Sequence, residues 1–133
     1  MKNVGQTNAF TLPELLLTAA ILAYSISAIL VTYINSIALN EASRNLTTAV
    51  SHADYVLENI RNMAFASIAV NISNGAWNWD ATAITAKGLT ALNSESTAVT
   101  SSGANPLDVV VTVSWKDLNS RGRSRAVKTT ISG

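Results

Sequence analysis

A long apolar stretch that carries no charge lies near the start of the chain, from Leu15 onward. No residue from Leu15 to Asn40 is charged, and as far as Ile34 the run consists of Leu, Ile, Val and Ala with a few Ser, Thr and Tyr. An apolar run longer than about 18 residues is typical of a membrane-spanning helix, whereas the apolar region of a secretory signal has only about 7 to 15 residues. This run continues into further helical sequence, so the pattern favours a transmembrane helix.

An amphipathic segment follows the apolar one. From Leu39 to Ala64 apolar residues recur at spacings of three and four, with charged and amide residues between them. This spacing predicts a helix that packs one stripe of side chains on another part of the protein. Neither Gly nor Pro occurs between Glu14 and Asn74, so we expect one helix from about Leu12 to about Ala69.

The remainder of the chain contains a predicted loop and a predicted hairpin. Residues 71–106 are rich in Asn, Ser, Thr, Ala and Gly without a sustained period, which predicts a long loop with at most one short helix or strand. Residues 107–115 and 125–131 alternate between two faces on either side of a turn at 119–122, which predicts a β-hairpin. The predicted fold is α+β, with a long N-terminal helix packed on a small antiparallel sheet.

Length and composition limit the functions open to the protein. With 133 residues, partly used in an apolar helix, the chain has room for one small folded head. The net charge of +1 argues against attraction of the whole protein to nucleic acid, and the absence of cysteine excludes disulfides and thiolate chemistry.

Candidate catalytic and metal-binding residues are few. The single histidine, His52, is too isolated for a triad or a zinc site, and we expect it at the surface. The segment Asp117–Gly122 weakly resembles a calcium loop, but Arg121 replaces an oxygen ligand and a distal Glu is missing. Trp77 and Trp79 are expected to pack in the small core rather than to bind a ligand. We therefore expect no metal, no cofactor and no enzymatic activity.

Glu14, a lone acid at the start of the apolar run, has a local explanation. The sequence from Thr11 to Glu14 fits a capping box, in which the Thr11 hydroxyl and the Glu14 carboxylate satisfy open N–H groups of the first helical turn. Pro13 is acceptable in that turn, and the helix dipole favours an acid there. The capping box explains why an acid is tolerated at this end of the helix, but it does not explain the polar leader that precedes Phe10.

The sequence Ala9-Phe10-Thr11-Leu12-Pro13-Glu14-Leu15-Leu16 resembles the leader junction of type IV pilins and type II secretion pseudopilins. The resemblance implies that a prepilin peptidase cuts between Ala9 and Phe10 and methylates the amine of Phe10. It also implies that Glu14 pairs with the N-terminal amine of a neighbouring subunit during assembly. This pairing is physically reasonable, because an unpaired carboxylate in a bundle of apolar helices is costly.

The resemblance implies a domain organisation, partners and a location. Residues 1–9 would form the leader peptide, residues 10–38 the transmembrane and filament-core helix, and residues 39–133 a pilin-like head. The implied partners are the prepilin peptidase, other pilin or pseudopilin subunits, the inner-membrane assembly platform and, before assembly, membrane lipid. The implied location is the bacterial cytoplasmic membrane, crossed once with the head outside the cytoplasm, followed by a type IV pilus or a periplasmic pseudopilus.

Three further features favour a minor pilin or pseudopilin. The helix lacks the internal Gly and Pro of many major pilins, and the head lacks their cysteine pair. Segments 52–61, 111–117 and 125–131 resemble those of PilV-type minor pilins and I-type pseudopilins.

Basic residues gather in the predicted hairpin, with Asp117 as the acid among them. One interpretation is contact with an anionic partner, either DNA or another subunit. The other is a solvated hairpin whose charges prevent unwanted strand pairing, which we favour because no aromatic residue is interleaved for base stacking. The residues concerned are Lys116, Arg121, Arg123, Arg125 and Lys128.

Two other functions remain open at this point. The first is an uncleaved single-pass membrane anchor that carries a small binding head. The second is a DNA-uptake pilin whose basic hairpin, with Arg121, Arg123, Arg125 and Lys128, contacts DNA. The expected function is a structural subunit, a minor pilin or pseudopilin, of a type IV pilus or a type II secretion pseudopilus.

Overall fold

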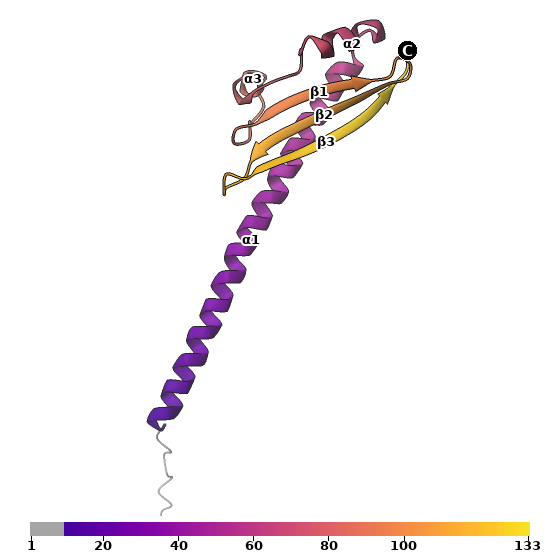
Figure 1. The fold of residues 1–133 in the computed structure, drawn as a ribbon. Helices are drawn as coiled ribbons and strands as arrows, with labels where there is room; N and C mark the ends of the chain where they lie inside the picture. Colours follow the sequence, from indigo (N-terminus) through magenta and orange to yellow (C-terminus); the bar gives the residue numbers. More distant parts are fainter. Residues whose placement is uncertain (1–9) are drawn as a thin grey trace, which may run out of the picture. The chain divides into compact units, whose positions relative to one another are not determined.

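The computed structural model of the protein describes residues 10–133, which form three helices and three strands (Figure 1). The expected leader, including Ala9, lies outside the described residues. The described chain falls into two units, one ending at Asn40 and one from Glu41 to Gly133. The helices and strands are α1 (Leu12–Arg61), α2 (Phe65–Ser73), α3 (Ala81–Ala86), β1 (Ser96–Ser102), β2 (Leu107–Lys116) and β3 (Gly122–Ile131).

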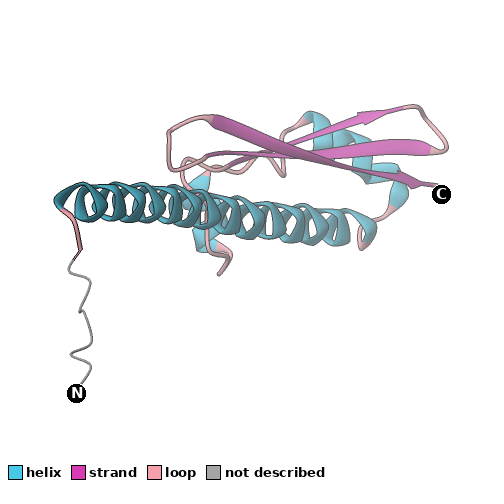
Figure 2. Cartoon of the chain, turned by 90° about the horizontal axis from the view of Figure 1, so that it is seen from below, coloured by secondary structure: helices cyan, strands magenta, loops and turns pink. Residues whose placement is uncertain are grey.

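The second unit has two layers, a helix and a sheet (Figure 2). The strands form an antiparallel sheet in the order β1-β2-β3. Alternate residues of β2, from Leu107 to Trp115, are buried, and the buried residues of α1 belong to the same core. The predicted α+β class, the strand at 107–115 and the hairpin are therefore confirmed, although the returning strand β3 begins at Gly122 rather than at residue 125.

The core is built from the predicted stripe of α1 and the inner face of β2. Ala49, Ala53, Val56 and Ile60 are completely inaccessible to solvent. They share one cluster with the β-branched residues of β2. Alanines occupy the first buried positions of this stripe, and the larger Val56 and Ile60 fill the core further along.

The predicted end of the long helix near Ala69 is wrong, because α1 ends at Arg61 and α2 begins at Phe65. Ala64, between the two helices, has an extended backbone conformation. The change of direction brings Ile68 and Ile72 of α2 into the same core as Ile60. Burial of these side chains decides where the first helix ends, although no Gly or Pro marks the position.

The predicted loop at 71–106 is also wrong in part, because it contains α3, β1 and the end of α2. Gly75 has a φ of 71°. The N–H groups of Gly75 and Ala76 donate to the carbonyls of Ile72 and Asn71, which is the Schellman ending of a helix. Asp80 caps α3 by accepting a hydrogen bond from the N–H of Ala83 at 2.8 Å.

Strand β1 is composed largely of Ser and Thr, so its sequence resembles a loop. Its full length nevertheless pairs with β2, and Thr97 and Val99 are buried in alternation. β1 therefore forms because β2 offers an edge with open hydrogen-bonding groups and because β-branched Thr and Val suit a half-buried strand.

Candidate functional site

The start of α1 carries the two residues expected to act in assembly. Phe10 is 69% exposed, and Glu14 lies exposed in the first turn of α1. The Glu14 carboxylate accepts from the backbone N–H of Thr11 at 3.4 Å. The Thr11 carbonyl, rather than its hydroxyl, accepts from the N–H of Glu14 at 3.0 Å. Only the carboxylate half of the predicted capping box is therefore formed, through a long hydrogen bond.

The Ser and Thr side chains within the apolar part of α1 form hydrogen bonds with the backbone of the same helix. Thr18, Ser25, Ser27, Thr32 and Ser36 each donate a hydroxyl hydrogen bond to the carbonyl four residues earlier, at 2.7–3.0 Å. A hydroxyl that is bonded in this way does not need water as a partner. Their donor groups therefore do not hinder transfer of this segment into an apolar environment.

One helix in the described part of the chain is long and apolar enough to span a membrane. It is α1, with a mean hydropathy of 2.2 over its most apolar 18 residues, none of which are buried in the protein. Apolar surface that is left in water on this scale is costly, at about 25 cal/mol for each Å². The segment is consistent with a single-pass membrane anchor.

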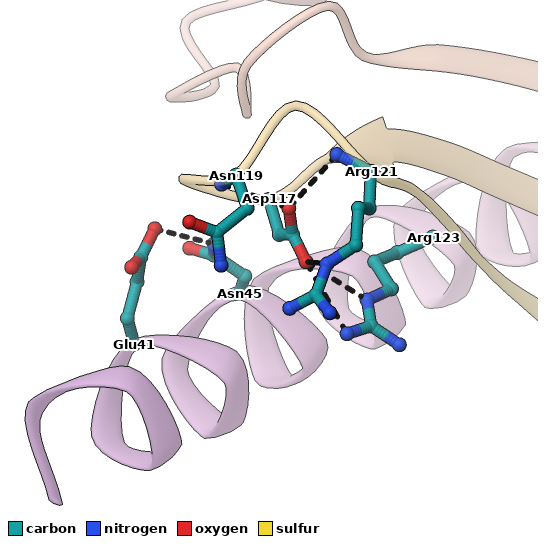
Figure 3. A network of polar contacts seen from close by, with 6 residues as sticks. All are labelled: Glu41, Asn45, Asp117, Asn119, Arg121 and Arg123. Atoms are coloured by element: carbon teal, nitrogen blue, oxygen red, sulfur yellow. Dashed lines mark hydrogen bonds and ion pairs between the residues drawn. The ribbon is translucent and has the colours of Figure 1, made fainter. Parts of the chain in front are cut away.

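Asp117 organises the turn between β2 and β3, as Figure 3 shows. One carboxylate oxygen accepts from the backbone N–H groups of Asn119 and Arg121, at 3.0 and 2.9 Å. The other accepts from the guanidinium groups of Arg121 and Arg123, at 3.1 and 3.2 Å. The Arg121 N–H and guanidinium, together with Arg123, hold the pKa of Asp117 below its usual value of 3.8.

The other predicted basic residues of the hairpin have different surroundings. Lys128 forms an ion pair with Asp108 at 2.8 Å, and the Thr130 hydroxyl donates a hydrogen bond to the same carboxylate. Both contacts lower the pKa of Asp108. Arg125 lies exposed on β3 and makes no ion pair within residues 10–133. Three of the four residues predicted for an anionic contact are thus already paired with carboxylates, which reduces the attraction of this hairpin for DNA phosphates.

His52 is not a surface residue, so that prediction is wrong. Its Nδ1 lies 2.7 Å from Oε1 of Glu95, and the two side chains are only 7% and 0% exposed. The second oxygen of Glu95 accepts from the N–H of Leu92 at 2.6 Å. A histidine on the apolar stripe and a glutamate in a polar segment gave no sign of this pairing, because 43 residues separate them in the chain.

The His52–Glu95 pair ties α1 to the segment that leads into β1. A carboxylate that orients an imidazole is also a component of acid–base catalysis. In the described part of the chain, however, no hydroxyl is hydrogen-bonded to His52, and burial keeps substrates away from the ring. The arrangement therefore has the geometry of a structural link rather than of a catalytic dyad.

A shallow groove of about 510 Å³ lies beside the turn of the hairpin. Its walls carry both acids and bases, including Glu41, Arg44 and Lys116. Small-molecule sites of this volume are mostly apolar with a few convergent polar groups. This groove differs from that pattern and presents no single charge for a ligand to match.

The two tryptophans of the predicted loop belong to the head. Trp77 is buried in the core, as predicted, and Trp79 is half-buried against it. Lys87 lies over the ring of Trp79, 4.3 Å from its centre, and Tyr55 packs 6.2 Å away at a tilt. The ring face of Trp79 is thus already occupied by a cation.

Comparison of the chain with family models, curated proteins and solved structures finds no match. The class of the protein therefore rests on its own features: an α+β head and an apolar helix that could span a membrane.

The lowered pKa of Asp117 predicts how the hairpin responds to acid. The folded state favours the ionised carboxylate, so its contribution is present at neutral pH and is lost as pH falls below about 4. We expect Asp117→Asn to weaken the hairpin at pH 7, and to make it less sensitive to acid than the wild type. The measurement is hydrogen exchange of the Arg121 and Arg123 amides between pH 7 and pH 3, compared at equal intrinsic exchange rate. Asp54→Asn, at an exposed position of α1, is the control, and an NMR titration midpoint for Asp117 at or above 3.8 would contradict the assignment.

The buried pair predicts a coupling between His52 and Glu95. Glu95→Ala leaves the imidazole and the Leu92 N–H without their partner, which should cost on the order of 3 kcal/mol of unfolding free energy. A double-mutant cycle combines Glu95→Ala with His52→Ala, and the unfolding of each variant in urea is measured by tryptophan fluorescence. The cycle should give a coupling energy of about 1 kcal/mol or more. Thr97→Val is the matched control, because the buried hydroxyl of Thr97 has no partner within the described residues and its removal should be nearly neutral. Additive effects of the two alanine substitutions would show that the pair is not energetically coupled.

Proposed function

We propose that the protein is a minor pilin or pseudopilin, a structural subunit of a type IV pilus or of a type II secretion pseudopilus. A prepilin peptidase removes residues 1–9, and the mature chain begins at Phe10. The apolar part of α1 holds the subunit in the cytoplasmic membrane, with the head on the far side from the cytoplasm. Assembly then moves this helix from lipid into the core of a filament.

The observation that carries the proposal is the single helix Leu12–Arg61 directly behind the leader-like junction. Its first part is exposed and apolar in the isolated chain, whereas its second part supplies the core of the head. Such a helix needs an apolar environment outside its own chain. Lipid provides that environment before assembly, and the apolar helices of other subunits provide it in the filament.

Glu14 supports the proposal through its position and its exposure. Within residues 10–133 its carboxylate has one long hydrogen bond, to the N–H of Thr11, which uses little of its acceptor capacity. A carboxylate with free acceptor capacity that enters a bundle of apolar helices requires a cationic partner. The amine that cleavage creates on a neighbouring Phe10 would meet this requirement.

The proposed processing predicts the mass of the mature protein. Protein made in a host with a prepilin peptidase should have lost residues 1–9 and gained one methyl group on Phe10. Intact-mass spectrometry measures both changes. An active-site variant of the peptidase is the control and should leave the mass at that of the whole chain. Retention of residues 1–9 with the active peptidase would instead indicate an uncleaved single-pass anchor.

The proposed pairing predicts the effect of changing Glu14. Glu14→Ala should leave membrane insertion unchanged, because it makes the segment more apolar, but recovery in sheared filaments should fall at least tenfold, as for loss of a buried charge pair. Glu58→Ala, at an exposed acid later in the same helix, is the matched control and should assemble normally. Equal recovery of wild type and Glu14→Ala would remove the assembly role of this carboxylate.

A further inference from the structure

The outer edge of β3 is open along ten residues. β3 is the last strand in the order β1-β2-β3, and it contains neither Pro nor a bulge in its pairing with β2. Open strand edges are templates for pairing with another chain, and proteins usually shorten, cover or distort them or place charged side chains on them. The length of this edge and its regular register therefore require an explanation.

The opposite edge of the sheet is covered by the protein itself. On β1, the N–H of Thr97 donates to the carbonyl of Trp79 at 2.8 Å, and the N–H of Val99 donates to Oδ1 of Asn78 at 3.2 Å. An isolated bridge joins Asp80 to Ser96 next to them. The edge of β1 is thus covered from Ser96 to Val99, whereas no backbone hydrogen bond within residues 10–133 covers the outer edge of β3.

The register shows which backbone groups of β3 point outward. The N–H of Asp117 donates to the carbonyl of Arg121 at 3.0 Å, and hydrogen-bonded pairs alternate along an antiparallel ladder from there. Arg123, Arg125, Val127, Thr129 and Ile131 are therefore bonded to β2. The intervening residues direct their N–H and C=O groups away from the sheet, and within residues 10–133 these groups have no hydrogen-bond partner. These are Gly122, Ser124, Ala126, Lys128 and Thr130.

Side chains next to the outward groups leave room for an incoming strand. Gly122, Ser124 and Ala126 are small, and Thr130 is bonded to Asp108 on β2. Lys128 is held over the sheet by its ion pair with the same Asp108. The approach to the backbone along β3 is therefore sterically open.

Charge selects among the strands that could pair there. β3 carries Arg123, Arg125 and Lys128 and no acid, and Arg121 precedes it. Antiparallel pairing of two copies of β3 would bring two sets of cations into one sheet with no acid on either strand, which is unfavourable. The charges that protect the edge from a second copy of this chain attract a strand that is rich in Asp or Glu, and exposed Arg125 is available to it.

We propose that the outer edge of β3 accepts an extended acidic strand from another protein. The partner strand bonds to the backbone of Gly122, Ser124, Ala126, Lys128 and Thr130, and its carboxylates face Arg125 and the neighbouring cations. Main-chain hydrogen bonds supply the affinity of such strand addition, and side chains supply its selectivity. The inference does not depend on the function proposed above, because it concerns the sheet of the head rather than Glu14 or cleavage.

The test uses the full-length protein in detergent micelles and a synthetic peptide of about nine residues that alternates Thr and Glu. We expect slower amide hydrogen exchange at the five outward-facing residues when this peptide is added. A peptide with Lys in place of Glu is the matched probe and should have no effect. Arg125→Gln should weaken binding of the acidic peptide about two- to fivefold, as for one exposed ion pair.

Backbone variants separate strand addition from simple charge attraction. Ala126→Pro removes one outward N–H without removing a bond to β2, and Pro is tolerated on edge strands. It should abolish binding, whereas Ala126→Ser should retain it. Ser124→Pro provides a second variant, and exchange of the inward amides of Arg125 and Val127 reports whether each variant is folded.

Four results would overturn the proposal. They are unchanged exchange with the acidic peptide, equal binding of the two peptides, normal binding by a folded Ala126→Pro variant, and concentration-dependent protection of the same amides without peptide. The last result would identify the partner of the edge as a second copy of this chain.

Discussion

Burial of the α1 stripe against β2 is the interaction on which the rest of the head depends. Each fully buried Val or Ile side chain contributes about 1.5–3 kcal/mol, and Val56, Ile60 and the inner valines of β2 all reach this state. Strands β1 and β3 carry few large apolar residues of their own. They pair with β2, one on each side. Loss of the contact between α1 and β2 would therefore remove the burial that stabilises the whole sheet.

The sequence predicted the elements whose burial leaves a regular pattern. The alternation at 107–115 and the stripe from Ala49 to Ile60 are repeated contacts with a single core, so each appears as a period in the chain. The end of α1 and the strand β1 have no such mark. Arg61 is followed by residues that could continue a helix, and β1 is rich in Ser and Thr. Both are decided by contacts with residues far away in the sequence, which local pattern does not encode.

The candidate functional residues divide in the same way. Glu14 was recognisable because an acid next to an apolar run conflicts with its surroundings, and such a conflict is visible in sequence alone. The His52–Glu95 pair was not recognisable, because each residue has an ordinary neighbourhood and only the fold brings them together. Composition identifies the basic residues of the hairpin, but only the fold shows that Asp117 and Asp108 form ion pairs with three of the five.

The hairpin charges also resolve two requirements that seem opposed. A strand edge that can accept a partner is a hazard for self-association, whereas a strand edge that is fully protected is useless for recognition. Cations on β3 repel an identical strand but attract an acidic one. The same side chains therefore oppose self-association and favour an acidic partner. Asp117 contributes by fixing Arg121 and Arg123 beside the turn, and Asp108 holds Lys128, which leaves Arg125 as the cation of β3 without an ion pair within residues 10–133. Selectivity at this edge is therefore a consequence of which cations are already paired, rather than of how many the hairpin carries.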